Sequence, residues 1–153
     1  MGNGKKGSSY KPRSFECKGY VEENGKRRND SSANIFESML LSDAFRELPT
    51  RAKALYMYCK AQYYGHRKPR ADYPDIPYMQ ADECFYLSFP EMGKYGLYSK
   101  TSKAEYYEDM KTLEAHGFIK RISKGHPGKK SIYKLTGDWQ TWEKQPESEK
   151  GKG

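Results

Sequence analysis

Residues 99–135, SKTSKAEYYEDMKTLEAHGFIKRISKGHPGKKSIYKL, decide how this chain folds. The first half, to His116, is predicted to be an amphipathic helix, because Tyr106, Met110 and Leu113 recur on one helical face. The second half holds two runs rich in β-forming residues, FIKRIS and SIYKL, joined by the loop KGHPGKK. The stretch therefore predicts a helix followed by a two-stranded hairpin with a basic tip.

Two helix-start signals stand close together before and within this stretch. Ser88 with Glu91, and Ser102 with Glu105, both have the Ser-x-x-Glu spacing of a capping box. The glycines of KYGLY and AHGFI are placed to end the two helices, and only the short segment GLYSKT separates them. This arrangement predicts two helices joined by a tight turn.

Upstream, the sequence predicts a short helix, a long helix and a strand. The short helix lies near Ser42–Glu47, and the long one covers TRAKALYMYCKAQYYG, residues 50–65. The run CFYLSF is predicted to be a strand with Phe85, Leu87 and Phe89 on one face. The long helix is expected to bury an apolar stripe made of Ala52, Leu55, Tyr56, Cys59 and Tyr63.

The composition describes one modest folded domain with polar tails. The chain has 153 residues, 35% hydrophobic residues and a mean hydropathy of −1.08. We expect a flexible basic N-terminal arm over residues 1–33, the folded domain over 34–142 and a disordered tail over 143–153. The net charge of +8, with a pI near 9.2, favours a nucleic acid or another polyanion as partner.

Other function classes find no support in the sequence. Cys17, Cys59 and Cys84 are odd in number and widely spaced, so neither a disulfide framework nor a zinc site is predicted. No run is apolar enough for a signal peptide or a membrane span, which leads us to expect a cytoplasmic protein. No phosphate-binding loop, catalytic triad or metal-binding carboxylate cluster occurs, so we expect no enzyme activity, no cofactor and no metal.

The predicted order of helix, strand, helix, turn, helix and hairpin is that of a winged helix-turn-helix, an α+β fold. The chain resembles winged-helix DNA-binding proteins of the plasmid, phage and conjugative-element replication-initiator type. The resemblance covers residues 36–142 and is carried by SMLLSDAFRELPTRAKALYMYCKAQYYG and TLEAHGFIKRI. It implies sequence-specific binding of double-stranded DNA, as a replication initiator or a regulator of a mobile genetic element.

The resemblance also implies which residues face DNA. The major groove is about 12 Å wide, so the N-terminal part of the second helix is the part that can enter it. The positive end of that helix also points toward phosphate. The residues expected to contact DNA are Thr101, Ser102, Lys103, Ala104, Tyr107 and Lys111 on the recognition helix, Lys124, Lys129 and Lys130 on the wing, and Lys26, Arg27 and Arg28 on the arm.

Two features depart from the family pattern. Glu108 stands where a basic or polar groove residue is common, although a carboxylate can accept a hydrogen bond from cytosine. Glu105, Asp109 and Glu114 make the whole helix mildly acidic, so the wing and arm are expected to supply most of the phosphate contacts.

Alternative interpretations stay open. The acidic helix also suits a winged-helix protein–protein adaptor in a replication or transcription complex, or a purely structural helix with solvated charges. His116 is expected to bond a carbonyl at the helix end, and Trp139 and Trp142 to anchor the end of the domain. No long terminal helix suggests dimerisation, which favours a monomer or a weak homodimer. The expected partners are double-stranded DNA and replication proteins, with no membrane.

Overall fold

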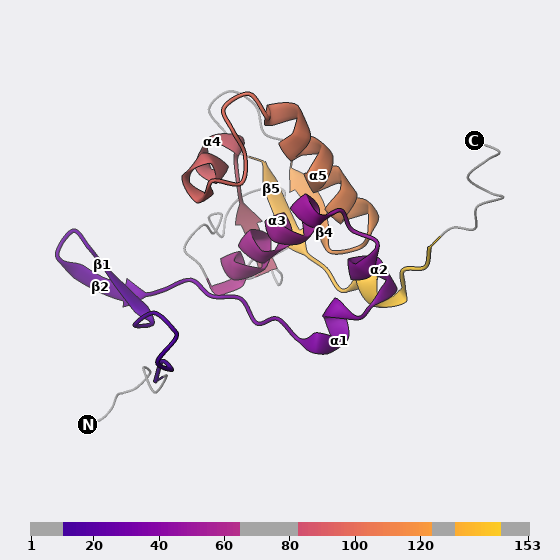
Figure 1. Cartoon of the computed structure of the whole chain (residues 1–153). Coiled ribbons are helices and arrows are strands. Elements are labelled where there is room, and N and C mark those ends of the chain that lie inside the picture. The colour runs from indigo at the N-terminus through magenta and orange to yellow at the C-terminus, as the bar shows by residue number, and fades with distance from the viewer. Residues whose placement is uncertain (1–10, 65–82, 124–130, 145–153) are drawn as a thin grey trace. The chain divides into compact units, whose positions relative to one another are not determined.

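The computed structural model describes residues 11–64, 83–123 and 131–144 (Figure 1). Residues up to Ser31 form one compact unit, and residues from Ser32 onward form another. Within the described residues the fold is mixed α+β, with five α-helices and short antiparallel sheets. The fold class expected from the sequence is therefore confirmed at this level.

A β-hairpin occupies the first unit. Its strands are β1 (Tyr20–Glu23) and β2 (Lys26–Asn29). Asn24 and Gly25 connect them with positive φ angles of 55° and 76°. Positive φ at both positions is typical of a type I′ turn, for which Asn-Gly is strongly preferred. Within the arm that the sequence predicts to be flexible over residues 1–33, residues 20–29 therefore form a paired hairpin.

The second unit contains the remaining helices and strands. The predicted short and long helices correspond to α2 and α3, and the three predicted strands are also present. The elements are α1 (Glu37–Leu40), α2 (Asp43–Arg46), α3 (Thr50–Ala61), β3 (Cys84–Tyr86), α4 (Phe89–Met92), α5 (Lys103–Ala115), β4 (Ile119–Ser123) and β5 (Ile132–Leu135), with 3-10 turns at Gln62–Tyr64, Gly93–Tyr95 and Asp138–Thr141.

The three strands of this unit form one antiparallel sheet with β5 in the middle. Cys84 of β3 pairs with Lys134, and Ile119 of β4 pairs with Leu135. Helices α3 and α5 pack against each other and against the sheet (Figure 1). The core lies between these helices and one face of the sheet.

The apolar stripes predicted from the sequence supply most of this core. The buried members come from both long helices and from all three strands or the residues next to them. They include Ala52, Leu55, Tyr56, Cys59, Phe85, Leu87, Tyr106, Met110, Leu113, Phe118, Ile119 and Tyr133.

Two predicted core residues are placed differently. Tyr63 is 41% exposed, because α3 ends at Ala61 and the chain continues as a 3-10 turn that leaves the helical stripe. Phe89 begins α4 instead of extending β3, because Pro90 in the first turn favours a helix start at this point. Phe89 is half-buried and still packs on the core.

The two predicted capping boxes mark the helix starts correctly but do not form as expected. Ser88 and Ser102 are the N-cap residues of α4 and α5, yet neither side chain bonds a backbone N–H of its helix. The Ser88 hydroxyl donates to Glu91 Oε1 at 3.1 Å. The Ser102 hydroxyl is engaged by Ser99 Oγ at 2.7 Å, so the preceding turn competes for it.

Gly117 forms the junction between α5 and β4. Its φ of +87° is left-handed, and its carbonyl accepts hydrogen bonds from the Trp139 N–H and the Thr136 hydroxyl, at 3.0 and 2.7 Å. Trp139 then stacks on Phe118, with ring centroids 5.8 Å apart. The junction therefore ties the C-terminal end of the unit to the end of α5.

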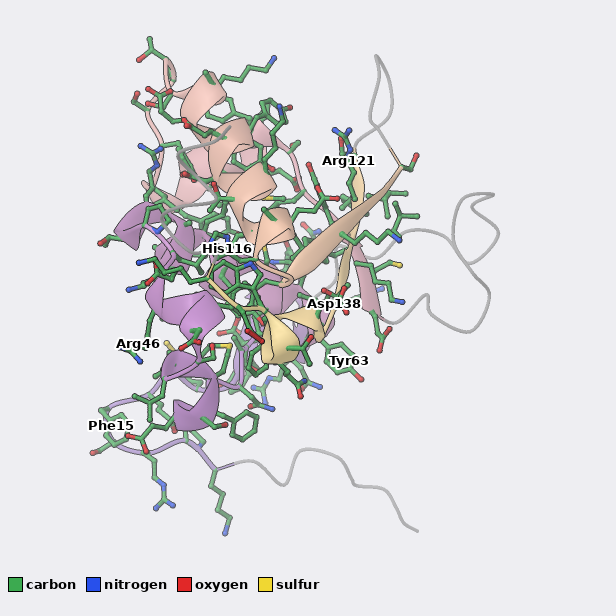
Figure 2. The ribbon with its side chains drawn as sticks, turned by 90° about the vertical axis from the view of Figure 1, so that its right-hand side faces the viewer. Phe15, Arg46, Tyr63, His116, Arg121 and Asp138 are labelled. Carbon is green, nitrogen blue, oxygen red and sulfur yellow. The ribbon has the colours of Figure 1, made fainter. Side chains whose placement is uncertain are left out.

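His116, which is labelled in Figure 2, strengthens the same end together with Trp142. The His116 Nδ1 atom donates to the Thr112 carbonyl at 2.8 Å, and its ring stacks on Trp142 with centroids 4.5 Å apart. The carbonyl bond predicted for His116 is present, and Trp139 and Trp142 pack at the end of the unit as predicted.

Replacing Gly117 by Ala is expected to destabilise the second unit. A Cβ at this position would lie 2.5 Å from Trp139 N and 2.7 Å from the Asp138 carbonyl carbon. The clash adds to the cost of a left-handed alanine, so the free energy of unfolding should fall by about 2 kcal/mol or more in urea denaturation. Gly93→Ala is the control, since φ is −60° there and a Cβ meets no atom within 4 Å. Equal stability of the two variants would contradict the assigned junction.

Alkaline pH is expected to destabilise the fold. Burial raises the pKa of Tyr133 to about 12, from 10.0, and that of the Cys59 thiol to about 12, from 9.0. Burial also raises the pKa of Tyr56 and Tyr106. The folded chain thus keeps protons that the unfolded chain releases, so stability is complete below pH 9 and falls as pH rises toward 12. A urea midpoint that stays constant from pH 8 to pH 11 would contradict this burial.

Candidate nucleic-acid interface

Helix α5 presents one face to solvent and buries the other. Its 13 residues span about 20 Å, long enough to cross a DNA groove. Tyr106, Asp109, Met110 and Leu113 are buried. The exposed positions repeat at helical spacing along the opposite face, and they are Lys103, Ala104, Tyr107, Glu108, Lys111, Glu114 and Ala115.

The position of α5 is fixed by a buried carboxylate. The Asp109 side chain is 4% exposed and forms an ion pair with Arg51 of α3. Arg51 donates to it from both Nε and Nη2, the latter at 3.2 Å, and the Tyr98 hydroxyl donates to the same carboxylate. One side chain of α5 is thereby joined to α3 and to the turn that precedes α5.

The surroundings of Arg51 reflect this network. The hydrogen bond to Asp109 is the main reason that the pKa of the Arg51 guanidinium is raised, and the negative charges of Asp109 and Glu105 add to the effect. Burial, followed by the hydrogen bond to Asp109, raises the pKa of Tyr98. Tyr98 therefore stays protonated and remains a donor at neutral pH.

This role of Asp109 was not predicted from the sequence, where Asp109 was one of three acidic residues that made the helix mildly acidic. A signal was available, because Asp109 lies three residues after Tyr106 and four before Leu113, on the apolar stripe itself. A carboxylate at such a position requires a buried partner, and Arg51 and Tyr98 supply it.

Two other acidic residues of α5, Glu114 and Glu105, also interact with the rest of the second unit. The Glu114 carboxylate accepts the backbone N–H of Arg121 at 3.3 Å, which ties α5 to β4 (Figure 2). Glu105 is half-buried near Arg51. The exposed face is therefore less acidic than the sequence suggests, and Glu108 is its central carboxylate.

Of the predicted recognition-helix residues, Thr101 and Ser102 precede α5, Lys103, Ala104 and Tyr107 lie in its N-terminal half, and Lys111 lies in its C-terminal half. Thr101, Lys103, Ala104 and Lys111 are exposed. Tyr107 is 38% exposed, and its ring packs edge-on against Tyr106 with centroids 4.9 Å apart, which limits its motion. Ser102 is half-buried, as expected for the residue that starts the helix.

Of the predicted wing and arm residues, only those of the arm lie among the described residues. Lys124, Lys129 and Lys130 lie outside the described residues. On the N-terminal hairpin, the predicted cations are partly engaged within the hairpin itself. Arg27 pairs with Glu22 at 3.8 Å and lies over the Tyr20 ring, Arg28 pairs with Glu23 at 3.0 Å, and Lys26 is exposed.

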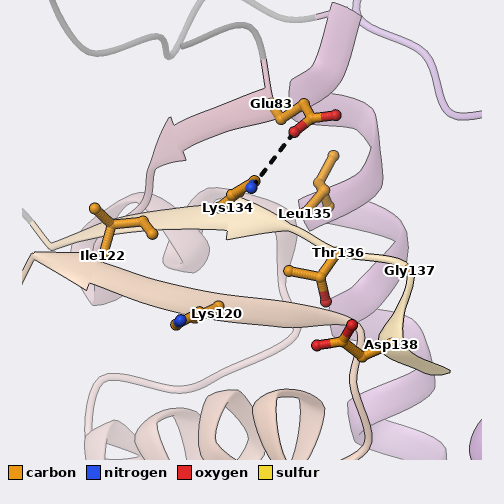
Figure 3. Close-up of a pocket in the computed structure, with 8 residues that line it drawn as sticks. All are labelled: Glu83, Lys120, Ile122, Lys134, Leu135, Thr136, Gly137 and Asp138. Carbon is orange, nitrogen blue, oxygen red and sulfur yellow. Dashed lines mark ion pairs between the residues drawn. The ribbon is translucent and has the colours of Figure 1, made fainter. Parts of the chain in front are cut away.

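Two shallow depressions elsewhere are less suited to a defined ligand. One, of about 420 Å³, lies over β4 and β5 and is lined by Lys120 and Lys134, but Glu83 already pairs with Lys134 at 3.7 Å (Figure 3). The other, of about 380 Å³, lies beside Phe36 and Tyr63 and has a mainly apolar lining.

The described residues hold no group of three or more His, Cys, Asp or Glu side chains that could bind a metal ion. In the same part of the chain, no helix is long and apolar enough to cross a membrane. Comparisons with protein-family models, curated proteins and solved structures find no match for this chain.

Tyr98→Phe is expected to loosen α5 by removing one donor from the Asp109 carboxylate. Loss of a hydrogen bond to a buried charge should lower the free energy of unfolding by about 2 kcal/mol, measured by urea denaturation. Tyr106→Phe is a matched control, because the Tyr106 hydroxyl is buried and has no hydrogen-bond partner in the described part of the chain.

The control variant should be as stable as the natural chain, or more stable by up to about 1 kcal/mol. Both substitutions keep the ring and remove only a hydroxyl. Equal losses in the two variants would show that the Tyr98–Asp109 bond does not hold α5 in place.

Proposed function

We propose that the second unit is a winged helix that binds double-stranded DNA, with α5 as its recognition helix. The order α3, β3, α4, α5, β4, β5 and the sheet order β3-β5-β4 support the proposal, because a winged helix joins its helix-turn-helix to a small sheet in this way. The short connection between α4 and α5 includes the left-handed Gly96, which suits a tight turn.

The observation that supports the proposal most is that α5 has one exposed face, which we call its free face. Within the described part of the chain, no hydrogen bond or ion pair engages the side chains of Lys103, Glu108 or Lys111, and Ala104 leaves the helix surface open between them. The opposite face is fixed to α3 through Asp109. A rigid helix with one open, partly basic face suits insertion into a major groove.

The charge of the chain supports the same partner. Lys100, Lys103 and Lys111 lie on the turn before α5 or along its exposed face. The net charge of +8 supplies a general attraction to phosphate. We assign phosphate contacts to the wing lysines, Lys124, Lys129 and Lys130, and to the hairpin cations, Lys26, Arg27 and Arg28, which a phosphate can draw away from their weak surface ion pairs.

The biological role we propose is that of a replication initiator or regulator of a mobile genetic element, based on the family resemblance of residues 36–142. In this role the protein acts in the cytoplasm as a monomer or weak homodimer, without catalysis or a cofactor. DNA and replication proteins are its partners.

One observation favours a second candidate, a protein–protein adaptor. The exposed face of α5 carries two lysines, Lys103 and Lys111, and two glutamates, Glu108 and Glu114, so its formal charge is balanced. The half-exposed Tyr107 lies among them. Balanced charges around an aromatic side chain also suit a protein partner.

Fluorescence anisotropy separates the two candidates. The full chain is titrated into a random duplex and into a duplex enriched by rounds of selection, each at low and physiological salt. Preference for the selected duplex at physiological salt supports the DNA-binding proposal. Equal binding to both duplexes that disappears with salt contradicts it and favours the adaptor.

A double substitution, Lys103→Glu with Lys111→Glu, is expected to weaken binding to the selected duplex. Two charge reversals facing DNA should cost at least about tenfold in affinity and reduce the salt slope by about two. Arg46→Glu is the control for charge, because Arg46 is exposed on α2, which packs near the Asp138–Thr141 turn and away from the start of α5 (Figure 2). Equal losses per reversed charge at the two places would contradict the assignment of α5.

A further inference from the structure

We propose that Glu108 is a specificity-determining residue that reads a cytosine in the DNA site; this inference rests on the proposed function. The other acidic residues of α5 have roles within the fold. Asp109 is buried against Arg51, and Glu114 accepts the N–H of Arg121. Glu108 is exposed, and its carboxylate has no partner within the described residues.

The position of Glu108 places it where bases would lie. It stands four residues after Ala104 and three before Lys111, so the three share one face of α5. The buried Asp109 is the next residue along the helix and is held by Arg51 and Tyr98. Because this anchor fixes the rotation of the helix, the side of α5 from which the Glu108 side chain leaves the backbone is also fixed relative to the rest of the second unit.

The chemistry of a carboxylate limits what it can contact in DNA. It only accepts hydrogen bonds, and phosphates repel it. In the major groove the cytosine N4 amino group donates a hydrogen bond that a carboxylate can accept. Adenine also offers an amino group, but its neighbouring N7 is an acceptor and disfavours a carboxylate. Cytosine is therefore the base that suits Glu108 best.

The same carboxylate lowers affinity for incorrect DNA. On a site without a suitably placed cytosine, Glu108 loses contact with water and gains no donor, while the surrounding phosphates repel it. Lys103 and Lys111 attract every duplex equally, whereas Glu108 rejects most of them. The balanced charge of the face is thus a means of discrimination between DNA sites.

Replacing the carboxylate by an amide tests this inference. Glutamine forms a bidentate pair with adenine N6 and N7, so Glu108→Gln should change the selected base pair at one position from C·G to A·T. Glu108→Ala should bind random duplex more tightly, and its discrimination at that position should fall roughly tenfold. Both substitutions are made at one exposed position, and unchanged thermal melting confirms that the two variants fold.

The readout is the set of duplexes selected by each protein, followed by anisotropy at physiological salt. Glu37→Gln is the matched control, with the same charge change at an exposed carboxylate of α1 instead of α5, and should select the same sites as the natural chain. If the natural chain prefers a site and Glu108→Gln keeps every base preference, the role of Glu108 is wrong while DNA binding stands. If the natural chain prefers no duplex, both the proposed function and this inference fail.

Discussion

The buried carboxylate of Asp109 is the constraint on which the arrangement of the second unit depends. An ionised side chain at 4% exposure is stable only when donors surround it, and here the donors come from two other elements, through Arg51 and Tyr98. Apolar contacts hold helices together but allow small rotations about the helix axis. Directional bonds to one carboxylate restrict that rotation, and they do so in the part of α5 next to its exposed residues.

The C-terminal end of α5 is held by hydrogen bonds to the Gly117 carbonyl and by stacked aromatic rings. Gly117 adopts a left-handed conformation so that its carbonyl can accept from Trp139 and Thr136, and the rings of Trp139 and Trp142 close over Phe118 and His116. The helix is thus held by the charged network of Asp109 in its middle and by stacked aromatic rings at its C-terminal end. Its free face, with Lys103, Tyr107 and Lys111, is consequently presented by a rigid support, which is what a recognition helix requires.

The sequence predicted the helices α2 to α5, the strands β3 to β5 and the exposed face of α5, because apolar residues at helical and strand spacing report directly on burial. It did not predict the single-turn helix α1. It did not identify the partner of Asp109, because Arg51 lies 58 positions away in the sequence and only the fold brings the two side chains together. The hairpin at Asn24-Gly25 was missed for another reason. Its strands are short and charged and lack apolar alternation, so only the turn indicated the pairing.

The central claim, that α5 meets DNA through its free face, is tested most directly by nuclear magnetic resonance of the isotopically labelled chain titrated with a selected duplex. We expect the largest shift changes at the backbone amides from Thr101 to Lys111, with small changes in α3 around Cys59, whose side chain is buried in the core. Shift changes that cluster on α1, α2 or the outer face of the sheet, while α5 is unaffected, would contradict the account.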